Sequence, residues 1–163
     1  MKNKIIMSIF IISVLTSCKL KQQKKTAGYY NYETECLGVE LDGSQTLRTW
    51  GIGRNRLDAV EQAKKNAVRD VLFKGILKGK SECNQKPVLF EVNVQEKHED
   101  YFNKFFADKG AYSEFISMKD ERIISGIFKE KKRIEDEVNE EVVVRVLRAE
   151  LKKKMIDDKI MNN

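Results

Sequence analysis

The chain has 163 residues, enough for one ordinary domain rather than two. Apolar residues make up 41% of it and charged residues 34%, which is typical of a soluble globular protein and excludes a disordered chain or one that crosses a membrane many times. The formal net charge of +6 is a mild excess over interspersed charges of both signs, so we expect no nucleic-acid partner.

The first residues have the three parts of an export signal. Lys2 and Lys4 supply positive charge, residues 5–15 form an apolar run, and small residues follow. The run is too short for a permanent membrane span, which needs about 20 apolar residues. We therefore expect residues 1–17 to be a signal peptide that is removed after export.

The signal ends in Leu15-Thr16-Ser17-Cys18. This ending resembles the lipobox of bacterial lipoproteins, in which a Leu and two small residues precede a Cys. The resemblance implies that the Cys18 sulfur receives a diacylglycerol, that cleavage follows, and that the new amine is acylated, with palmitate as the expected chain. Each buried CH₂ contributes about 0.8 kcal/mol, so two or three chains attach a protein to a membrane almost permanently. An ordinary secretory signal with an incidental Cys is the alternative.

Residues 18–29 are polar and show no apolar periodicity, so they predict a lipidated, flexible tether. Their lysines could contact anionic head groups, although a solvated linker is the simpler interpretation. Lys19 stands where many diderm bacteria use Asp to retain lipoproteins in the inner membrane. By this analogy we expect anchoring in the outer membrane, on its periplasmic face, with residues 30–163 as a single domain.

Two cysteines lie within that domain, Cys36 and Cys83. An even number of cysteines in an oxidising compartment favours a disulfide between them. Two buried free thiols are the alternative, because sequence spacing does not show whether the Cα atoms approach within about 7 Å.

The domain begins with a predicted β-hairpin. Residues 30–41 and 45–53 each alternate polar and apolar side chains, and Asp42-Gly43 between them is a strong hairpin signal. Trp50, in the second of these segments, is expected to be buried.

The next segment predicts a long helix over residues 56–77. Asn55 stands at the N-cap position with Asp58 three residues later, a plausible capping pair. Gly79 is expected to end the helix. Three small side chains on one face would let this helix lie close against a sheet: Ala59, Ala63 and Ala67.

Pro87 precedes an alternating segment, so we predict a strand over residues 88–94. Residues 95–108 predict a second helix that is closed by Lys109-Gly110. Its aromatic stripe could be a partner-binding surface, but such spacing more often indicates core packing; the stripe comprises Tyr101, Phe102, Phe105 and Phe106.

The last third predicts more sheet and a final helix. Residues 112–118 are expected to be irregular or a short strand, and residues 122–134 and 141–148 a second hairpin around an acidic loop. The second arm of that hairpin is continuous and β-branched, as in a central strand. Residues 149–160 predict a terminal helix. The whole pattern indicates an α+β fold, with an antiparallel sheet of about four to five strands and helices packed mainly on one face.

The sequence offers little catalytic chemistry. His98 is the only histidine, so a multi-His zinc site is excluded and a Ser-His-Asp triad would depend on it alone. Phe102 stands where a second metalloprotease His would be required. We expect no metal, no cofactor and no enzymatic activity.

One turn before the long helix could bind a ligand. Gly51 and Gly53, followed by Arg54 and Asn55, could hold a phosphate at the helix N-terminus. Arg56 stands where phosphate-binding loops carry a third glycine. A turn that simply needs glycine is therefore the stronger interpretation.

Residues 50–67, a strand leading through a Gly-x-Gly turn into an alanine-spaced helix, resemble the strand-to-helix core of the LPP20 family and of flagellar-assembly T-protein N-terminal domains. The stretch Cys-Leu-Gly-Val-Glu-Leu-Asp-Gly-Ser at residues 36–44 also resembles small Bacteroidota lipoproteins. These resemblances imply an envelope protein and supply no catalytic residues.

From these features we expect a membrane-anchored, non-catalytic binding or assembly module of the cell envelope, accessory to an apparatus such as one for secretion or motility. Its partners would be the membrane, through the lipid on Cys18, and an envelope protein. A small-ligand carrier or an envelope-modifying enzyme is the alternative.

Overall fold

The computed structural model describes residues 33–117 and 137–162. The described residues all belong to one unit of the chain, Tyr32–Asn163. The predicted signal, Cys18 and the tether lie outside the described residues, as does the predicted strand over residues 122–134.

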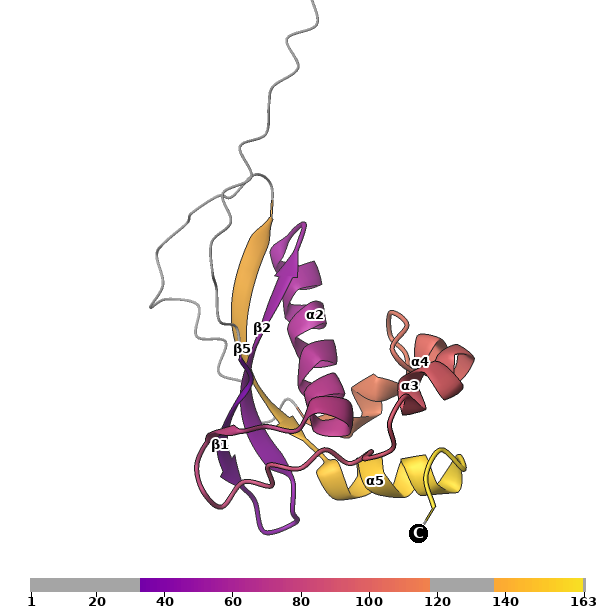
Figure 1. The fold of residues 1–163 in the computed structure, drawn as a ribbon. Helices are drawn as coiled ribbons and strands as arrows, with labels where there is room; N and C mark the ends of the chain where they lie inside the picture. Colours follow the sequence, from indigo (N-terminus) through magenta and orange to yellow (C-terminus); the bar gives the residue numbers. More distant parts are fainter. Residues whose placement is uncertain (1–32, 118–136, 163) are drawn as a thin grey trace, which may run out of the picture. The chain divides into compact units, whose positions relative to one another are not determined.

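The described part of the chain forms an α+β fold around a mostly antiparallel sheet (Figure 1). The sheet order is β3-β1-β2-β5-β4, and only the β1–β3 pair is parallel. Helices lie mainly on one face, as the sequence predicted. The strands are β1 (Glu35–Val39), β2 (Gln45–Gly53), β3 (Lys78–Gly79), β4 (Ile116–Ser117) and β5 (Val138–Val146).

The predicted hairpin is confirmed as β1 and β2. The Asp42 carboxylate accepts a hydrogen bond from the Ser44 backbone N–H at 2.9 Å, and Gly43 has a φ of 78°. Asp and Gly suit such a turn because Asp bonds the backbone two residues on and glycine adopts positive φ without steric cost. Trp50, expected to be buried, is half-buried within β2, opposite Glu141 of β5.

The predicted long helix begins where expected and ends earlier. It comprises α2 (Arg56–Arg69) and a π-helical turn, η1 (Asp70–Lys74). Gly75, with a φ of 77°, ends it, so the prediction that Gly79 does so is wrong. The chain turns at Gly75 because the backbone there passes close to residue 85: a Cβ on Gly75 would lie 2.2 Å from the Gln85 carbonyl oxygen.

The predicted strand over residues 88–94 is wrong. The backbone N–H groups of Val88 and Leu89 donate to the carbonyls of Val71 and Leu72, each at 2.9 Å. This segment therefore pairs with the end of the preceding helix, whose last carbonyls need external donors, instead of with a strand. Val88 and Leu89 are both buried although they are consecutive, which no strand on a half-exposed sheet would do.

The predicted helix over residues 95–108 is two short helices, α3 (Val94–Lys97) and α4 (Glu99–Phe105). His98 separates them with φ −120° and ψ 37°. The aromatic stripe is core packing, as expected. Phe102 meets Phe73 edge-on with ring centroids 4.9 Å apart, and Tyr101 donates to Asp158 at 2.5 Å.

A short 3-10 helix, η2 (Ala111–Phe115), leads from the Gly110 turn into β4. The last helix, α5 (Arg148–Asp157), confirms the core of the predicted terminal helix. It buries Leu151 and Met155 against the same side of the domain as the aromatic stripe. One hydrophobic core therefore joins the sheet, α2, α4 and α5.

Candidate functional site

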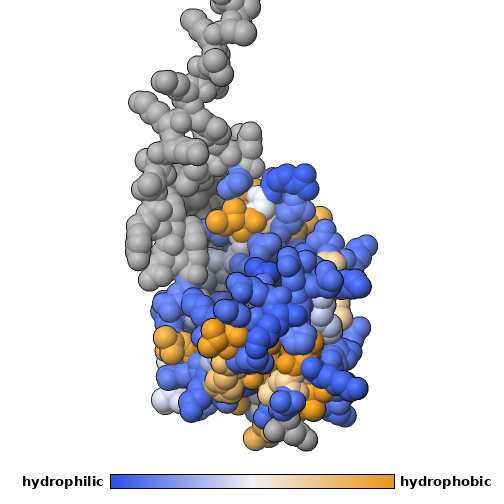
Figure 2. All heavy atoms as spheres, turned by 45° about the vertical axis from the view of Figure 1, so that its right-hand side comes forward, coloured by the Kyte–Doolittle hydropathy of each residue, from blue (hydrophilic) through white to orange (hydrophobic). Residues whose placement is uncertain are grey.

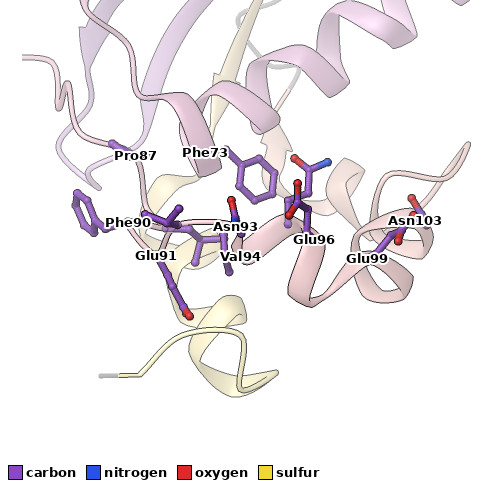
Figure 3. Close-up of a pocket in the computed structure, with 12 residues that line it drawn as sticks. Phe73, Pro87, Phe90, Glu91, Asn93, Val94, Glu96, Glu99 and Asn103 are labelled. Atoms are coloured by element: carbon purple, nitrogen blue, oxygen red, sulfur yellow. The ribbon is translucent and has the colours of Figure 1, made fainter.

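An open hollow of about 760 Å³ lies where the chain leaves η1 and runs into α3 and α4. Phe73 and side chains from Pro87 to Asn103 line it, and we term it the groove (Figure 3). Figure 2 shows a mostly hydrophilic face of the molecule with separate apolar patches.

The floor of the groove is apolar and anchored in the core. Leu89 and Val94 are each 4% exposed, and both belong to the core cluster. Phe73 is half-buried and held edge-on against Phe102. Residues fixed by packing in this way give a rigid base to whatever binds above them.

Two large apolar side chains stand out from the floor. Phe90 is 66% exposed and Val92 is 78% exposed, although their chain neighbours Leu89 and Val94 are buried. Figure 3 shows the Phe90 ring at one end of the groove, Glu99 and Asn103 at the other, and Phe73 between them. The groove thus has an apolar end and a polar end.

A turn keeps these side chains outside the core. Asn93 adopts the left-handed conformation, with φ 62° and ψ 19°, and Val94 then begins α3. Asn tolerates this conformation better than most residues with a side chain. The Val94 backbone N–H donates to the Glu91 carbonyl at 3.4 Å and closes this turn, which holds Val92 and follows directly after Phe90 and Glu91.

The groove is acidic. Its lining includes the carboxylates of Glu91, Glu96 and Glu99, and no lysine, arginine or histidine side chain lines it. Lys97 donates a hydrogen bond to Glu91, and this contact lowers the pKa of the Glu91 carboxyl. Glu96 and Glu99 are exposed and form no ion pair with any residue that the structure describes.

A scan against protein-family models, a search of curated proteins and a search of solved structures each found no match to this chain.

The binding turn suggested by the sequence lies elsewhere in the fold. Gly51 and Gly53 belong to β2, Arg54 pairs with Asp58 at 3.4 Å, and the Asn55 side chain accepts the Asp58 backbone N–H at 3.0 Å. None of these residues lines the groove. Asn55 is engaged as the helix N-cap, as its position predicted.

The two glycines serve helix packing. A Cβ on Gly51 would lie 2.0 Å from the Ala59 carbonyl oxygen, and one on Gly53 would lie 2.5 Å from the Ala59 backbone nitrogen. Glycine is required at both positions because α2 lies directly against β2.

Cys36 and Cys83 are joined as a disulfide, with their Cα atoms 6.2 Å apart. Both residues are buried, at 1% and 6% exposure. The bond attaches β1 to the loop that leads to Pro87, so it braces one approach to the groove.

Within residues 33–117 and 137–162, no group of three or more His, Cys, Asp and Glu side chains is placed to hold a metal ion. His98 is half-buried at the junction of α3 and α4. In the same part of the chain, no helix is both long and apolar enough to cross a membrane.

Sequence reasoning missed the groove because it assigned residues 88–94 to a strand. An available signal was the run Phe90-Glu91-Val92-Asn93. Asn directly after alternating large apolar and charged residues favours a left-handed turn over a continuing strand.

Proposed function

We propose that this protein is a lipid-anchored, non-catalytic binding or assembly module of the bacterial cell envelope. The observation that carries the proposal is Leu15-Thr16-Ser17-Cys18 at the end of a charged and then apolar N-terminus. By the Lys19 analogy, the anchor is in the outer membrane and the domain faces the periplasm.

Two features of the folded domain support this role. The Cys36–Cys83 disulfide suits an oxidising compartment such as the periplasm. The groove carries Phe90 and Val92 in water, where large apolar side chains close to each other often indicate a contact surface.

The proposed tether and anchor would raise the concentration of the domain near membrane-bound partners. A domain held near the membrane by residues 18–29 meets membrane-bound partners at a raised effective concentration. Contacts that would be too weak between freely diffusing proteins then suffice, so a small groove can serve as the whole binding surface.

The proposal is tested by replacing the lipidated residue in cells. Cys18→Ser should move the chain from the membrane fraction to the soluble fraction and remove the lipid from its N-terminal peptide in mass spectra. Ser17→Ala is the matched control, because it keeps a small residue before Cys18 and should leave both readouts unchanged. An unacylated N-terminus upstream of Cys18 in the wild-type chain would refute the anchor.

The membrane and its face are tested separately. Density-gradient separation of inner and outer membranes should place the wild-type chain with the outer membrane. Protease added to intact cells should leave it uncut, and protease added after the outer membrane is opened should digest it. Recovery in the inner membrane, or digestion in intact cells, would contradict the proposed location.

A small-ligand carrier remains a second candidate, because the groove volume of about 760 Å³ is within the range of small-molecule pockets, about 300–1,000 Å³. Native mass spectrometry of the freshly purified chain would favour this function if it showed a constant added mass that Phe73→Ala removes.

A further inference from the structure

We propose that the groove binds a basic segment of a partner protein, in which a bulky apolar side chain is flanked by lysine or arginine. This inference rests on the proposed function as a binding module and gives its partner a chemistry. It assigns the apolar end of the groove to the partner's apolar side chain and the acidic end to its cations.

Phe90 and Val92 form the apolar part of the proposed binding surface. They stand in water beside a floor of buried Leu89 and Val94, with the half-buried Phe73 ring between the two ends of the groove. An apolar side chain placed between Phe90 and Phe73 would remove both rings from water. Burial of aromatic surface of this kind supplies much of the energy of small interfaces.

The charge of the groove selects the partner. The chain as a whole carries an excess of positive charge, +6, whereas the groove is lined by three glutamates and no cationic side chain. Glu91 is already engaged by Lys97. Glu96 and Glu99 have no ionic partner among the described residues, so they are left to attract a cation from outside.

The same charges disfavour a membrane as the occupant. Exposed Phe90 and Val92 could enter a lipid surface, but Glu91, Glu96 and Glu99 would then face anionic head groups at short range. Segments that bind anionic membranes carry clusters of lysine and arginine instead. A protein segment with basic residues satisfies both ends of the groove.

The test pans the full chain, carried in detergent micelles, against a random peptide library. The enriched peptides should carry lysine or arginine on both sides of a Phe, Trp, Leu or Ile residue. The affinity of a labelled consensus peptide should fall at least about tenfold in the Glu96→Lys/Glu99→Lys variant and in Phe90→Ser, and it should fall as salt rises.

Matched controls lie outside the groove. Glu150→Lys reverses one charge on an exposed residue of α5, as each substitution of the double variant does in the groove. Leu57→Ser removes an apolar side chain that is 81% exposed on α2. Both should leave the affinity unchanged. All variants replace exposed side chains, so their melting temperatures should stay within about 2 °C of the wild-type chain.

Several results would overturn the inference. Absence of enrichment, or enrichment of peptides without basic residues, would do so. A second test measures co-sedimentation of the unanchored Cys18→Ser chain with phosphatidylcholine–phosphatidylglycerol vesicles. If adding Phe90→Ser weakened this co-sedimentation and left peptide binding intact, the groove would face lipid and the inference would be overturned. A change in self-association caused by Phe90→Ser, again with peptide binding intact, would make a second copy the occupant.

The two proposals fail separately. Peptide binding does not require the anchor, and fractionation of Cys18→Ser does not require the groove. If the wild-type chain carried the lipid but bound no basic peptide, the partner chemistry alone would be refuted. If the wild-type chain bound the peptide but carried no lipid, the anchor alone would be refuted.

Discussion

Gly51 of β2 lies directly against Ala63 of α2, with no room for a methyl group between them. A Cβ on Gly51 would lie 2.3 Å from the Ala63 backbone nitrogen. Ala59, Ala63 and Ala67 are all fully buried, so three of the side chains on the buried face of α2 are single methyl groups. The helix and strand backbones therefore pack almost in contact, and this pairing fixes where α2 and the elements that follow it lie.

This contact predicts the effect of Gly51→Ala. The new methyl group would collide with backbone atoms of Ala59 and Ala63, which cannot move without shifting the helix. Overpacking of this kind costs about 1–3 kcal/mol or more. Urea unfolding of the variant should show its midpoint at a clearly lower concentration than that of the wild-type chain.

Gly38→Ala is the control for that experiment. A Cβ on Gly38 would meet only the ends of the Lys80 and Glu82 side chains, at 3.9 and 4.0 Å. Its unfolding free energy should stay within about 0.5 kcal/mol of the wild-type value. Equal midpoints for the two variants would show that α2 does not press on β2 at Gly51.

A second prediction concerns the start of α2. The Asn55 side chain accepts the Asp58 backbone N–H at 3.0 Å, which satisfies one of the helix's free donors. Asn55→Ala should lower the unfolding free energy by about 1 kcal/mol, and Asn55→Asp should restore it because Asp is an equally good cap. Chemical denaturation followed by circular dichroism measures both. If Asp and Ala behaved alike, the cap would contribute nothing.

A third prediction concerns the Cys36–Cys83 disulfide, which closes a loop with a sequence separation of 47. On the chain-entropy model, losing such a cross-link costs about 4 kcal/mol. The Cys36→Ala/Cys83→Ala chain should therefore unfold at a markedly lower denaturant concentration than the oxidised wild-type chain.

Reduction provides the matching control for the disulfide. A reductant should lower the stability of the wild-type chain and leave that of the double variant unchanged. Mass spectrometry without reductant should show one peptide pair containing Cys36 and Cys83. Finding both as free thiols in protein taken from cells would contradict the disulfide.

A fourth prediction concerns pH. Asp70, the first residue of η1, is half-buried, and desolvation raises its pKa above the ordinary value of 3.8 despite the hydrogen bond that Thr34 donates to it. A carboxyl with a raised pKa in the folded state binds its proton more tightly there than in the unfolded chain. Its contribution to stability is therefore greatest below pH 3.8 and is lost as pH rises through the raised pKa.

Asp70→Asn tests this sign. Asn cannot ionise, and its amide oxygen can still accept the Thr34 hydroxyl, so the variant should gain stability relative to wild type as pH rises from about 4 towards 7. Urea unfolding at several pH values gives the difference. Parallel stability profiles for the two chains would mean that the folded protein does not raise the Asp70 pKa.

Local patterns predicted much of the fold. Asp42-Gly43 predicted the hairpin, Asn55 the first helix boundary, and the β-branched run in residues 141–148 the strand β5. These succeeded because a turn, a cap and a strand depend on residues that are neighbours in sequence. The aromatic stripe of α4 was likewise assigned to the core from its spacing alone.

Apart from Trp50, which is half-buried instead of buried, the failures lie between Leu72 and Phe105, where contacts distant in sequence decide the structure. Gly75 ends the helix because the backbone of residue 85 returns beside it. Residues 88–94 carry the spaced apolar side chains that suggested a strand, yet the N–H groups of Val88 and Leu89 pair with the helix end. The groove arises from this return of the chain, so the local signal at Asn93 could indicate a turn there but could not place the groove.

The sequence by itself determined the α+β class and the ends of several elements, because each depends on residues that are close together along the chain. The export and lipidation signal is also a local pattern, and it stays a prediction from the sequence. Tertiary structure alone decided that Gly51 serves helix packing, that Cys36 reaches Cys83, and that exposed Phe90 lines the same groove as Glu96 and Glu99. The reason is physical: close packing and the return of the chain on itself bring together atoms that the sequence separates by tens of residues.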